Sequence, residues 1–281
     1  IPKRVGYARP WRNLFLTRRV LPRHGAVAMH KRSVDEINQR IRKDSLPPAY
    51  PADAHHIHQY LHLAAALGAN PAPLAPCLTV TAEAIANFIA KFNLAANSNE
   101  SAPFFGLNAG AEYGPAKRWP EARFIEAAIQ IQRQTNCRWL IFGLKAESEM
   151  AARIVAEISR AAEKQFGREA TANNPRAFNL AGATTLAELC SALKFCRVLL
   201  TNDSGPMHVA AALGTPVVVP FGSTSPELTG PGLPGDTRHH LLCAHAPCSP
   251  CFLRECPIDF RCMTAISADA VVKAVLETNL K

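Results

Sequence analysis

The alternation of apolar strand patterns with amphipathic helix patterns after residue 103 is the feature that most constrains how this chain folds. Predicted strands span residues 104–107, 138–142, 177–180, 197–201 and 216–220, and predicted helices between them span residues 121–136, 147–166, 185–195 and 206–213. Strands that alternate with helices in this way are typical of a parallel, doubly wound sheet. We therefore predict an α/β fold with its ligand site at the carboxyl ends of the strands.

The segment Thr201–Leu213, TNDSGPMHVAAAL, turns sharply from a predicted strand into a helix. Helix-start N–H groups attract anions and hydroxyls, so we expect Asp203, Ser204 and Gly205 to lie at a ligand site. The alternative is that Asp203 or Ser204 only caps the helix, which Pro206 would start.

A second segment, Phe104–Pro120, fits the same kind of ligand. It reads FFGLNAGAEYGPAKRWP and opens from a short strand into a glycine-containing loop. Lys117 and Arg118 precede a helix start, where positive charge is unfavourable because it opposes the helix dipole. The two cations are understandable if an anion, such as a diphosphate, binds between them and the free N–H groups of the helix. The alternative is a solvated Lys-Arg pair beside a core tryptophan, Trp119.

Both segments resemble the heptosyltransferases that build the lipopolysaccharide inner core, and among them most closely the type II enzymes. The resemblance rests on GAEYGPAKRWP, TNDSGPMHVAAALGTPVVVPFGSTSP, CSPCFLRECPIDFRCM and the opening IPKRVGY, in the family's order. It implies a GT-B glycosyltransferase of glycosyltransferase family 9, with two Rossmann-like domains. The implied reaction moves heptose from ADP-heptose to a heptose of the growing core.

The resemblance also suggests a domain division. We expect residues 1–95 to be the remainder of an N-terminal acceptor domain, residues 96–266 the nucleotide-sugar domain, and residues 267–281 a helix that packs back towards the first domain. Family members begin with a strand and a glycine-rich turn whose Asp is proposed as the general base, and we expect that unit to lie upstream of Ile1. Donor binding is then expected of this chain, and full catalysis is not.

The segment between the two expected domains has a recognisable pattern as well. Asn93–Pro103 is polar and rich in helix breakers, which is typical of a linker. Before it, Ala82–Phe92 is predicted to be a helix with Thr81 as its N-cap.

The resemblance assigns roles to individual residues. Lys117 would neutralise the donor diphosphate as ADP leaves, and Asp203 would accept hydrogen bonds from heptose hydroxyls. His208, in a first helical turn, would be neutral and donate to a hydroxyl or phosphate oxygen; the alternative is a packing histidine. Glu149 would bind the ribose diol, with Glu147 as its competitor, although either acid could simply complement a helix dipole. Further expected substrate-binding residues are Gly110, Glu112, Tyr113, Thr184, Thr185, Ser204 and Gly205, with the two threonines beside the adenine.

No DxD pair that would bind Mg²⁺ occurs in the sequence, so we expect no metal or other cofactor. Cys248, Cys251, Cys256 and Cys262 do have ligand-like spacing, and a zinc or iron–sulfur site remains an alternative to free structural thiols. Members of the family often carry His where this chain has Phe260, so a metal ligand set that included this position is lost here. A cluster of histidines, His55, His56, His58 and His62, is expected in an exposed loop and helix start.

The excess of positive over negative charge is confined to one end of the chain. Residues 1–45 contain 12 Lys or Arg and 3 Asp or Glu, so they carry the whole net charge of +9. Such a face suits anionic lipid or phosphorylated glycolipid, and in the absence of a nucleic-acid motif we expect no nucleic-acid partner. The alternative is a merely solubilising face.

Neither a membrane span nor a secretory signal is apparent in the sequence. We therefore expect a cytosolic protein, with peripheral attachment to the inner face of the cell membrane left open. Two other functions also stay open: a different GT-B enzyme, such as a UDP-sugar epimerase, and a non-catalytic protein that binds an ADP-sugar.

Overall fold

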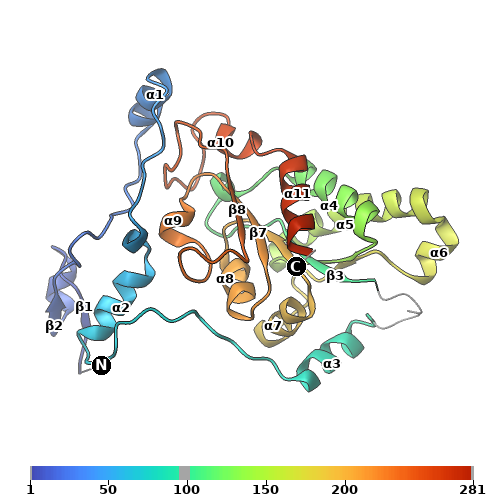
Figure 1. Ribbon diagram of the computed structural model, residues 1–281, viewed down its shortest axis with the longest axis horizontal. Coiled ribbons are helices and arrows are strands. Elements are labelled where there is room, and N and C mark those ends of the chain that lie inside the picture. The colour runs from blue at the N-terminus through green and yellow to red at the C-terminus, as the bar shows by residue number, and fades with distance from the viewer. Residues whose placement is uncertain (1, 95–101, 280–281) are drawn as a thin grey trace.

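A computed structural model describes residues 2–94 and 102–279 of the chain. Its main element is a six-stranded parallel sheet with the order β5-β4-β3-β6-β7-β8 (Figure 1). The strands are β3 (Phe104–Asn108), β4 (Arg138–Ile141), β5 (Ala177–Asn179), β6 (Leu199–Thr201), β7 (Val217–Phe221) and β8 (His240–Cys243). The predicted parallel α/β sheet is confirmed.

Helices cover both faces of the sheet because its strands are apolar on both sides. Phe105 and Leu107 pack into a core shared with α4 (Glu121–Thr135), α5 (Ser148–Phe166) and α11 (Ala268–Asn279). Phe104, on the same strand, belongs to a second core on the opposite face. Helices α3 (Ala82–Lys91), α7 (Leu186–Phe195) and α8 (Gly205–Ala212) contribute to that second core.

The strand order places a topological switch point between β3 and β6. From β3 the chain runs outward through β4 to β5, and after α7 it returns to the other side of β3 as β6. Asn108 at the end of β3 pairs in register with Thr201 at the end of β6. In open parallel sheets ligands bind in the crevice at such a point.

Every helix and strand predicted after residue 103 is present, with small shifts at its ends. Pro120 is the N-cap of α4. A capping box forms at the start of α7, because Thr185 Oγ1 accepts from Glu188 N and Glu188 Oε2 accepts from Thr185 N. The sequence patterns did not predict α6 (Arg168–Asn173), α9 (Pro226–Thr229), α10 (Arg261–Thr264) or β8.

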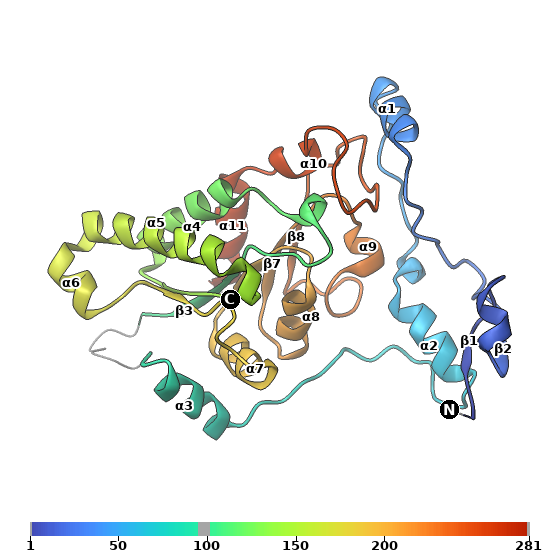
Figure 2. The same cartoon turned by 180° about the vertical axis from the view of Figure 1, so that it is seen from behind.

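The N-terminal segment lies along one side of this domain, on the side of α9 (Figures 1 and 2). It contains a two-stranded parallel sheet of β1 (Val5–Tyr7) and β2 (Arg18–Val20), followed by α1 (Val34–Arg42) and α2 (Ile57–Ala65). The 3₁₀ turns are η1 (Arg12–Phe15), η2 (Ala52–Ala54), η3 (Pro115–Lys117) and η4 (Lys145–Glu147).

Specific contacts hold this segment on the main domain. Arg32 N donates to Cys251 O at 3.0 Å, and Arg40 Nε donates to Pro247 O at 2.9 Å. Ile37 on α1 is buried in the core that faces α4 and α5. Further along, α3 packs on α7, and Thr81 caps α3 as predicted.

The expected domain boundaries are only partly visible. Residues 95–101 of the expected linker, and with them the boundary between 95 and 96, lie outside the described residues. Helix α11 contacts α4, β7 and β8, and its predicted return towards the N-terminal domain stays a prediction. Over the described residues, no helix is both long and apolar enough to cross a bilayer.

Candidate functional site

A cavity of about 510 Å³ opens at the switch point, at the carboxyl ends of β3 and β6. Nine of the predicted site residues line it: Gly110, Glu112, Tyr113, Lys117, Thr184, Asp203, Ser204, Gly205 and His208. These residues come from three separate loops, which follow β3, β5 and β6. The loops converge because parallel strands present their carboxyl ends at one edge of the sheet.

An ion pair between Lys117 and Asp203 forms one wall of the cavity. Lys117 Nζ lies 2.6 Å from Asp203 Oδ2, and the two side chains are only 14% and 5% exposed. Thr224 Oγ1 donates to the same carboxylate oxygen at 2.6 Å. The Asp203 carboxylate is therefore committed to a cation and a hydroxyl, and the Lys117 ammonium is held at the cavity wall.

Tyr113 lies beside this ion pair. Lys117 Nζ is 4.8 Å from the centre of the Tyr113 ring, and the Arg254 guanidinium is 5.5 Å from it. Tyr113 Oη donates to Phe252 O at 2.8 Å, and Arg254 Nε donates to Tyr113 O at 2.6 Å. These contacts join the loop after β3 to the cysteine-containing loop near residue 250.

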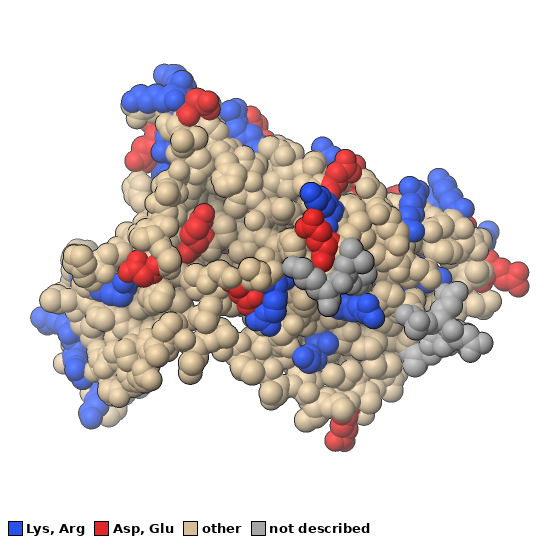
Figure 3. All heavy atoms as spheres, in the orientation of Figure 1, with Lys and Arg blue, Asp and Glu red and all other residues tan. Residues whose placement is uncertain are grey.

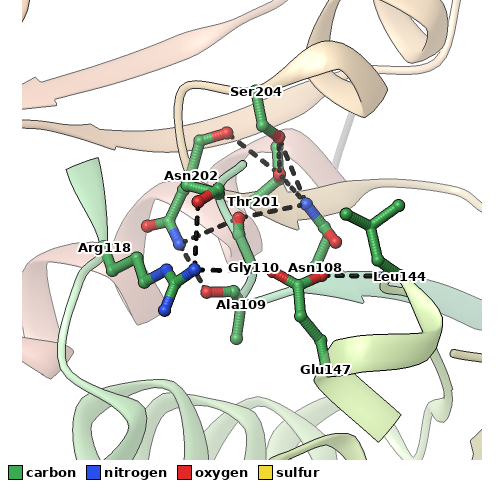
Figure 4. Close-up of polar contacts among 10 residues, drawn as sticks. Asn108, Ala109, Gly110, Arg118, Leu144, Glu147, Thr201, Asn202 and Ser204 are labelled. Atoms are coloured by element: carbon green, nitrogen blue, oxygen red, sulfur yellow. Dashed lines mark hydrogen bonds and ion pairs between the residues drawn. The ribbon is translucent and has the colours of Figure 1, made fainter. Parts of the chain in front are cut away.

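Two asparagines hold the loops after β3 and β6 together beneath the cavity (Figure 4). Asn108 Nδ2 donates to Thr201 Oγ1 and to Ser204 Oγ, each at 3.2 Å. Asn202 Nδ2 donates to Ala109 O at 2.7 Å, and Asn202 Oδ1 accepts from the backbone N–H of residue 119 at 2.9 Å. Both asparagines are buried and fix the two loops relative to one another, and Asn108, which the sequence patterns did not single out, also lines the cavity.

Helix α8 begins at the cavity with Ser204 as its N-cap. The Ser204 side chain makes no capping hydrogen bond, so the alternative in which Asp203 or Ser204 serves only as a side-chain cap is not supported, and the helix begins at Gly205 rather than at Pro206. The helix start therefore faces the cavity with its dipole uncompensated by a capping side chain.

His208 lines the cavity from the first turn of α8 and is exposed within it, so it is not a packing histidine. Desolvation by the surrounding walls lowers the pKa of His208 below its ordinary value of 6.5. The charge of Lys117 acts in the same direction, whereas that of Asp203 opposes it. A neutral His208, as the sequence predicts, can donate one hydrogen bond and accept another.

The loop after β4 brings Glu147 into the cavity instead of Glu149. Glu147 lines the cavity, accepts from Leu144 N at 2.9 Å and lies 3.9 Å from Arg118 (Figure 4). A Cβ atom on Gly110 would lie within 2.4 Å of the Glu147 carboxyl group, so a side chain at this position would displace that carboxyl group.

Two predicted residues lie elsewhere. Of the residues that the structure describes, those lining the cavity do not include Glu149 or Thr185. Glu149 is an exposed residue in the first turn of α5, and the Thr185 side chain caps α7. The alternative of a solvated Lys-Arg pair holds only for Arg118, because Lys117 is largely buried in its ion pair.

Four late cysteines, Cys248, Cys251, Cys256 and Cys262, surround an interior cavity of only about 10 Å³, and all are free thiols. A hydrogen bond between the Cys248 and Cys262 thiols lowers the pKa of Cys248 to about 7 and raises the pKa of Cys262. Over residues 2–94 and 102–279, no group of three or more His, Cys, Asp or Glu is arranged to hold a metal ion.

The four histidines near residue 58 only partly match their expected place in an exposed loop and helix start. Helix α2 begins at Ile57, as expected. His55, however, is buried, and its Nε2 lies 3.1 Å from Gly230 O. Tyr7 Oη contacts His62 Nδ1 at 3.0 Å. The expectation of exposure is wrong, because this turn packs on the loop after α9 and buries His55, while His56, His58 and His62 are half-buried.

Comparisons with known proteins show what the chain is similar to. The sequence profile of glycosyltransferase family 9 (heptosyltransferase) matches residues 19–260. Lipooligosaccharide heptosyltransferase 2 of Campylobacter jejuni is 33% identical over 170 residues, which are 60% of this chain and 48% of that protein. The chain thus spans about half the length of this curated relative.

Two solved structures resemble this one. ADP-heptose lps heptosyltransferase II of Escherichia coli superposes with a TM-score of 0.57 at 29% identity, over 75% of this chain and 55% of that one. A family 9 glycosyl transferase from Veillonella parvula has a TM-score of 0.64 at 21% identity, over 99% of this chain and 68% of that one. The second likeness concerns the fold alone.

Proposed function

This chain belongs to glycosyltransferase family 9, the heptosyltransferases, and has their Rossmann-like GT-B fold; from that premise we propose that its cavity binds ADP-heptose as a glycosyl donor. The proposed reaction transfers the heptose to a heptose of the lipopolysaccharide inner core, as in the type II enzymes. The Campylobacter jejuni and Escherichia coli relatives, whose names give them this kind of activity, support the proposal.

The observation that carries the proposal is the Lys117 ammonium at a cavity that also receives the start of α8. A cation and a helix start at one cavity wall form a site for an anion with two or more charges. The cavity volume of about 510 Å³ falls in the range of small-molecule and cofactor sites. A nucleoside diphosphate sugar meets both requirements.

The chemistry of glycosyl transfer gives Lys117 its role. The oxygen of an acceptor hydroxyl bonds to the anomeric carbon and gives up its proton, while the bond between the anomeric carbon and the phosphate oxygen breaks and its electron pair leaves with ADP. Negative charge therefore grows on the diphosphate, next to the Lys117 ammonium and the helix start. Because Asp203 already holds the ammonium in place, this stabilisation needs no reorganisation at the moment of reaction.

We assign the sugar to the other residues of the β6 loop. Asp203 retains lone pairs that can accept from heptose hydroxyls, and neutral His208 can donate to a hydroxyl or phosphate oxygen. On the nucleotide side, Glu147 is our choice for the ribose diol, because it lines the cavity and Glu149 does not. Thr184 lies on the same side and would flank the adenine.

We also propose that the reaction needs no metal ion or other cofactor, because Lys117 and the start of α8 supply the positive charge that a glycosyl diphosphate requires. The proposed place of action is the cytosolic side of the membrane, where the acceptor core would be reached by peripheral attachment. The basic N-terminal 45 residues support this placement.

A titration of the chain with ADP-heptose, monitored by calorimetry, tests the donor proposal. Lys117→Met should weaken binding by about tenfold to a hundredfold, because a charge-assisted contact is lost. Lys91→Met is the matched control, since Lys91 pairs with Glu188 on the surface of α3 and α7. Equal affinities of the wild-type protein and Lys117→Met would overturn the assignment.

Two further measurements separate the alternatives. Thermal shifts with ADP-heptose and with UDP-N-acetylglucosamine distinguish a heptosyltransferase from an epimerase that acts on UDP-sugars. A radiolabelled transfer assay with a core acceptor distinguishes an enzyme from a protein that only binds an ADP-sugar. We expect stabilisation by the ADP-sugar and not by the UDP-sugar.

Glu147→Gln and Glu149→Gln test the ribose assignment. We expect the first to lower ADP affinity and the second to leave it unchanged. The opposite result would assign the contact with the ribose diol to Glu149.

A further inference from the structure

Four late cysteines, Cys248, Cys251, Cys256 and Cys262, surround an interior cavity that we call the thiol cavity. Its volume of about 10 Å³ is close to the smallest that holds one water molecule. The Lys, Arg, Asp and Glu side chains drawn in Figure 3 lie on the outside of the molecule. In contrast, none of the described residues that line the thiol cavity carries an ammonium, guanidinium or carboxylate group. The cavity is therefore suited to a small, uncharged molecule.

A buried serine hydroxyl adds a polar group to this cavity. Ser223 lines it, is buried, and its Oγ has no hydrogen-bond partner over residues 2–94 and 102–279. A buried hydroxyl without a partner is costly, so it indicates that a small polar molecule completes its hydrogen bonds. Because a hydroxyl both donates and accepts, it can hold either water or a peroxide.

Two of the thiols are in direct contact. Cys248 begins the cysteine loop, which we define as residues 248–256, and its thiol accepts a hydrogen bond from Cys262 in α10. This bond lowers the pKa of Cys248 from 9.0 to about 7, whereas burial raises the pKa of Cys251. The thiolate is the reactive form of cysteine, so Cys248 is the nucleophile of the pair. Cys262 lies where it can complete a disulfide.

The cysteine loop also supports the loop after β3. Tyr113 Oη donates to Phe252 O at 2.8 Å, and Arg254 Nε donates to Tyr113 O at 2.6 Å. Ala116, which precedes Lys117, donates its backbone N–H to Arg254 O at 2.9 Å. A movement of the cysteine loop therefore reaches the residues that hold the Lys117 ammonium.

A second set of contacts joins the cysteine loop to the loop after β7. Phe252 N donates to Ser223 O at 2.7 Å. The next residue, Thr224, donates to the Asp203 carboxylate at 2.6 Å. The cysteine loop is thus connected to both members of the ion pair at the switch point.

We propose that Cys248 and Cys262 form a redox switch, in which hydrogen peroxide oxidises the two thiols to a disulfide that weakens donor binding at the switch point. The Cys248 thiolate attacks one peroxide oxygen, the O–O bond breaks, hydroxide leaves, and Cys248 becomes a sulfenic acid. The Cys262 sulfur then attacks the sulfenic sulfur, and the hydroxyl group leaves with the Cys262 proton as water. The two electrons that the thiols lose reduce the peroxide to hydroxide and water.

The disulfide should move the cysteine loop. Bonded sulfurs lie about 2.05 Å apart, much closer than hydrogen-bonded sulfurs. Cys262 has little room to move, because a Cβ atom on Gly222 would lie 3.0 Å from Cys262 Sγ. We therefore expect Cys248 to move towards α10 and to draw the cysteine loop away from Tyr113. The inference rests on the proposed function only for the identity of the ligand whose affinity falls.

Tryptic digestion without reductant identifies the disulfide. Trypsin separates residues 239–254, which contain Cys248, from residues 262–273, which contain Cys262. Treatment of the chain with hydrogen peroxide at neutral pH should link these two peptides, and dithiothreitol should separate them again. Mass spectrometry of the digest measures the cross-linked fraction.

Three variants show which side chains are responsible. Cys248→Ala should abolish the link. Cys243→Ala is the matched control, because Cys243 lies in the same tryptic peptide but does not line the thiol cavity, and it should form the link as the wild-type protein does. Ser223→Ala should slow the link about fivefold, since one hydrogen bond to the peroxide is lost.

Calorimetry with ADP-heptose measures the consequence for the donor. Complete cross-linking should weaken binding at least about fivefold, the lower end of the usual coupling between two linked sites. Cys248→Ala treated with the same peroxide should keep its affinity. By linkage, saturating ADP-heptose should shift the dithiol–disulfide equilibrium towards the dithiol by the same factor.

Hydrogen exchange reports the loop movement without any ligand. Cross-linking should speed exchange at the Ala116 amide, which donates to Arg254 O, in the wild-type protein and not in Cys248→Ala. This measurement separates the switch from the proposed function, because the faster exchange is expected even if the reduced chain fails to bind ADP-heptose.

Four outcomes would overturn the proposal. The first is the absence of the link, or a disulfide between Cys248 and Cys251 in its place. The second is unchanged exchange at Ala116 in the cross-linked protein. The third is an unchanged affinity for ADP-heptose in cross-linked protein that binds this donor when reduced. The fourth is a zinc or iron ion bound in stoichiometric amount to these cysteines, which would protect the thiols from peroxide.

Discussion

Lys117 Nζ lies 2.6 Å from Asp203 Oδ2, although the two residues come from loops after different strands of the sheet. Each residue is a candidate ligand group when considered alone, yet in the structure they neutralise one another. The pair thus holds the Lys117 ammonium at the cavity wall without leaving an isolated buried ion, which would be costly.

Breaking the pair from either side should have different consequences. Lys117→Met should mainly lower donor affinity. Asp203→Asn leaves a largely buried ammonium with a weaker partner, and should cost about 1–3 kcal/mol of stability. Chemical denaturation and calorimetric titration of both single variants and the double variant measure the coupling. Additive effects would show that the two side chains act independently, contrary to the geometry.

Thr224 should position Asp203. Thr224→Val removes the hydroxyl that donates to Asp203 Oδ2, and should cost about 1 kcal/mol of stability together with a loss of donor affinity. Thr215→Val is the matched control, because Thr215 Oγ1 is also buried but donates to Leu193 O at 2.8 Å, away from the cavity. A loss of affinity in the control as large as that in Thr224→Val would make the effect one of stability alone.

Gly110 should be intolerant of any side chain while Glu147 is present. Gly110→Ala places a methyl group on the Glu147 carboxyl group and should displace that side chain from the loop. We expect lower stability and weaker ADP binding. The double variant Gly110→Ala/Glu147→Ala should recover the stability but not the ADP affinity. Failure to recover stability would mean that the clash lies elsewhere.

Thr185 should matter for stability and not for the donor. Thr185→Ala removes the side-chain acceptor at the start of α7, at a cost of about 1 kcal/mol. Denaturant unfolding and ADP titration of this variant decide whether the Thr185 side chain only caps α7 or also contacts the adenine, as expected from the sequence. A clear loss of ADP affinity would restore Thr185 to the binding site.

His239 should make the protein less stable in mild acid. Burial lowers the pKa of His239 below 6.5, and its Nδ1 accepts from Val217 N at 3.3 Å, so protonation breaks that bond. With a lower pKa in the folded state, the stabilisation is complete above pH 6.5 and is lost as the pH falls through the folded-state value. Unfolding free energies measured across this range should fall less steeply in His239→Asn, which keeps an acceptor without the titration. An unchanged slope would contradict this assignment.

The main domain could be predicted because its periodic elements are long. Apolar strand and helix patterns, with helix caps such as Thr185 with Glu188, locate the strands and helices from Phe104 to Phe221 except α6. Strand β8 escaped prediction because its four residues follow a glycine- and proline-rich loop and carry little periodic signal. The short helices α9 and α10, of four residues each, could not be predicted for the same reason.

The site could be predicted as a set of loops but not as a set of contacts. Parallel topology brings the strand ends together, so Lys117, Asp203 and His208 could be assigned to one cavity from the sequence. The hydrogen bond from Thr224 depends on tertiary packing and left no signal. Glu147 and Glu149 have the same chemistry two positions apart, where successive side chains of a helical turn point in different directions, and only the backbone path selects Glu147.

The affinity of the chain for ADP-heptose, measured by calorimetry beside Lys117→Met and the control Lys91→Met, tests the central claim most directly. The account predicts saturable binding to the wild-type protein and to the control, and binding weakened at least tenfold in Lys117→Met. Absence of binding to the wild-type protein, or equal binding to all three, would contradict the assignment of the cavity to a nucleoside diphosphate sugar.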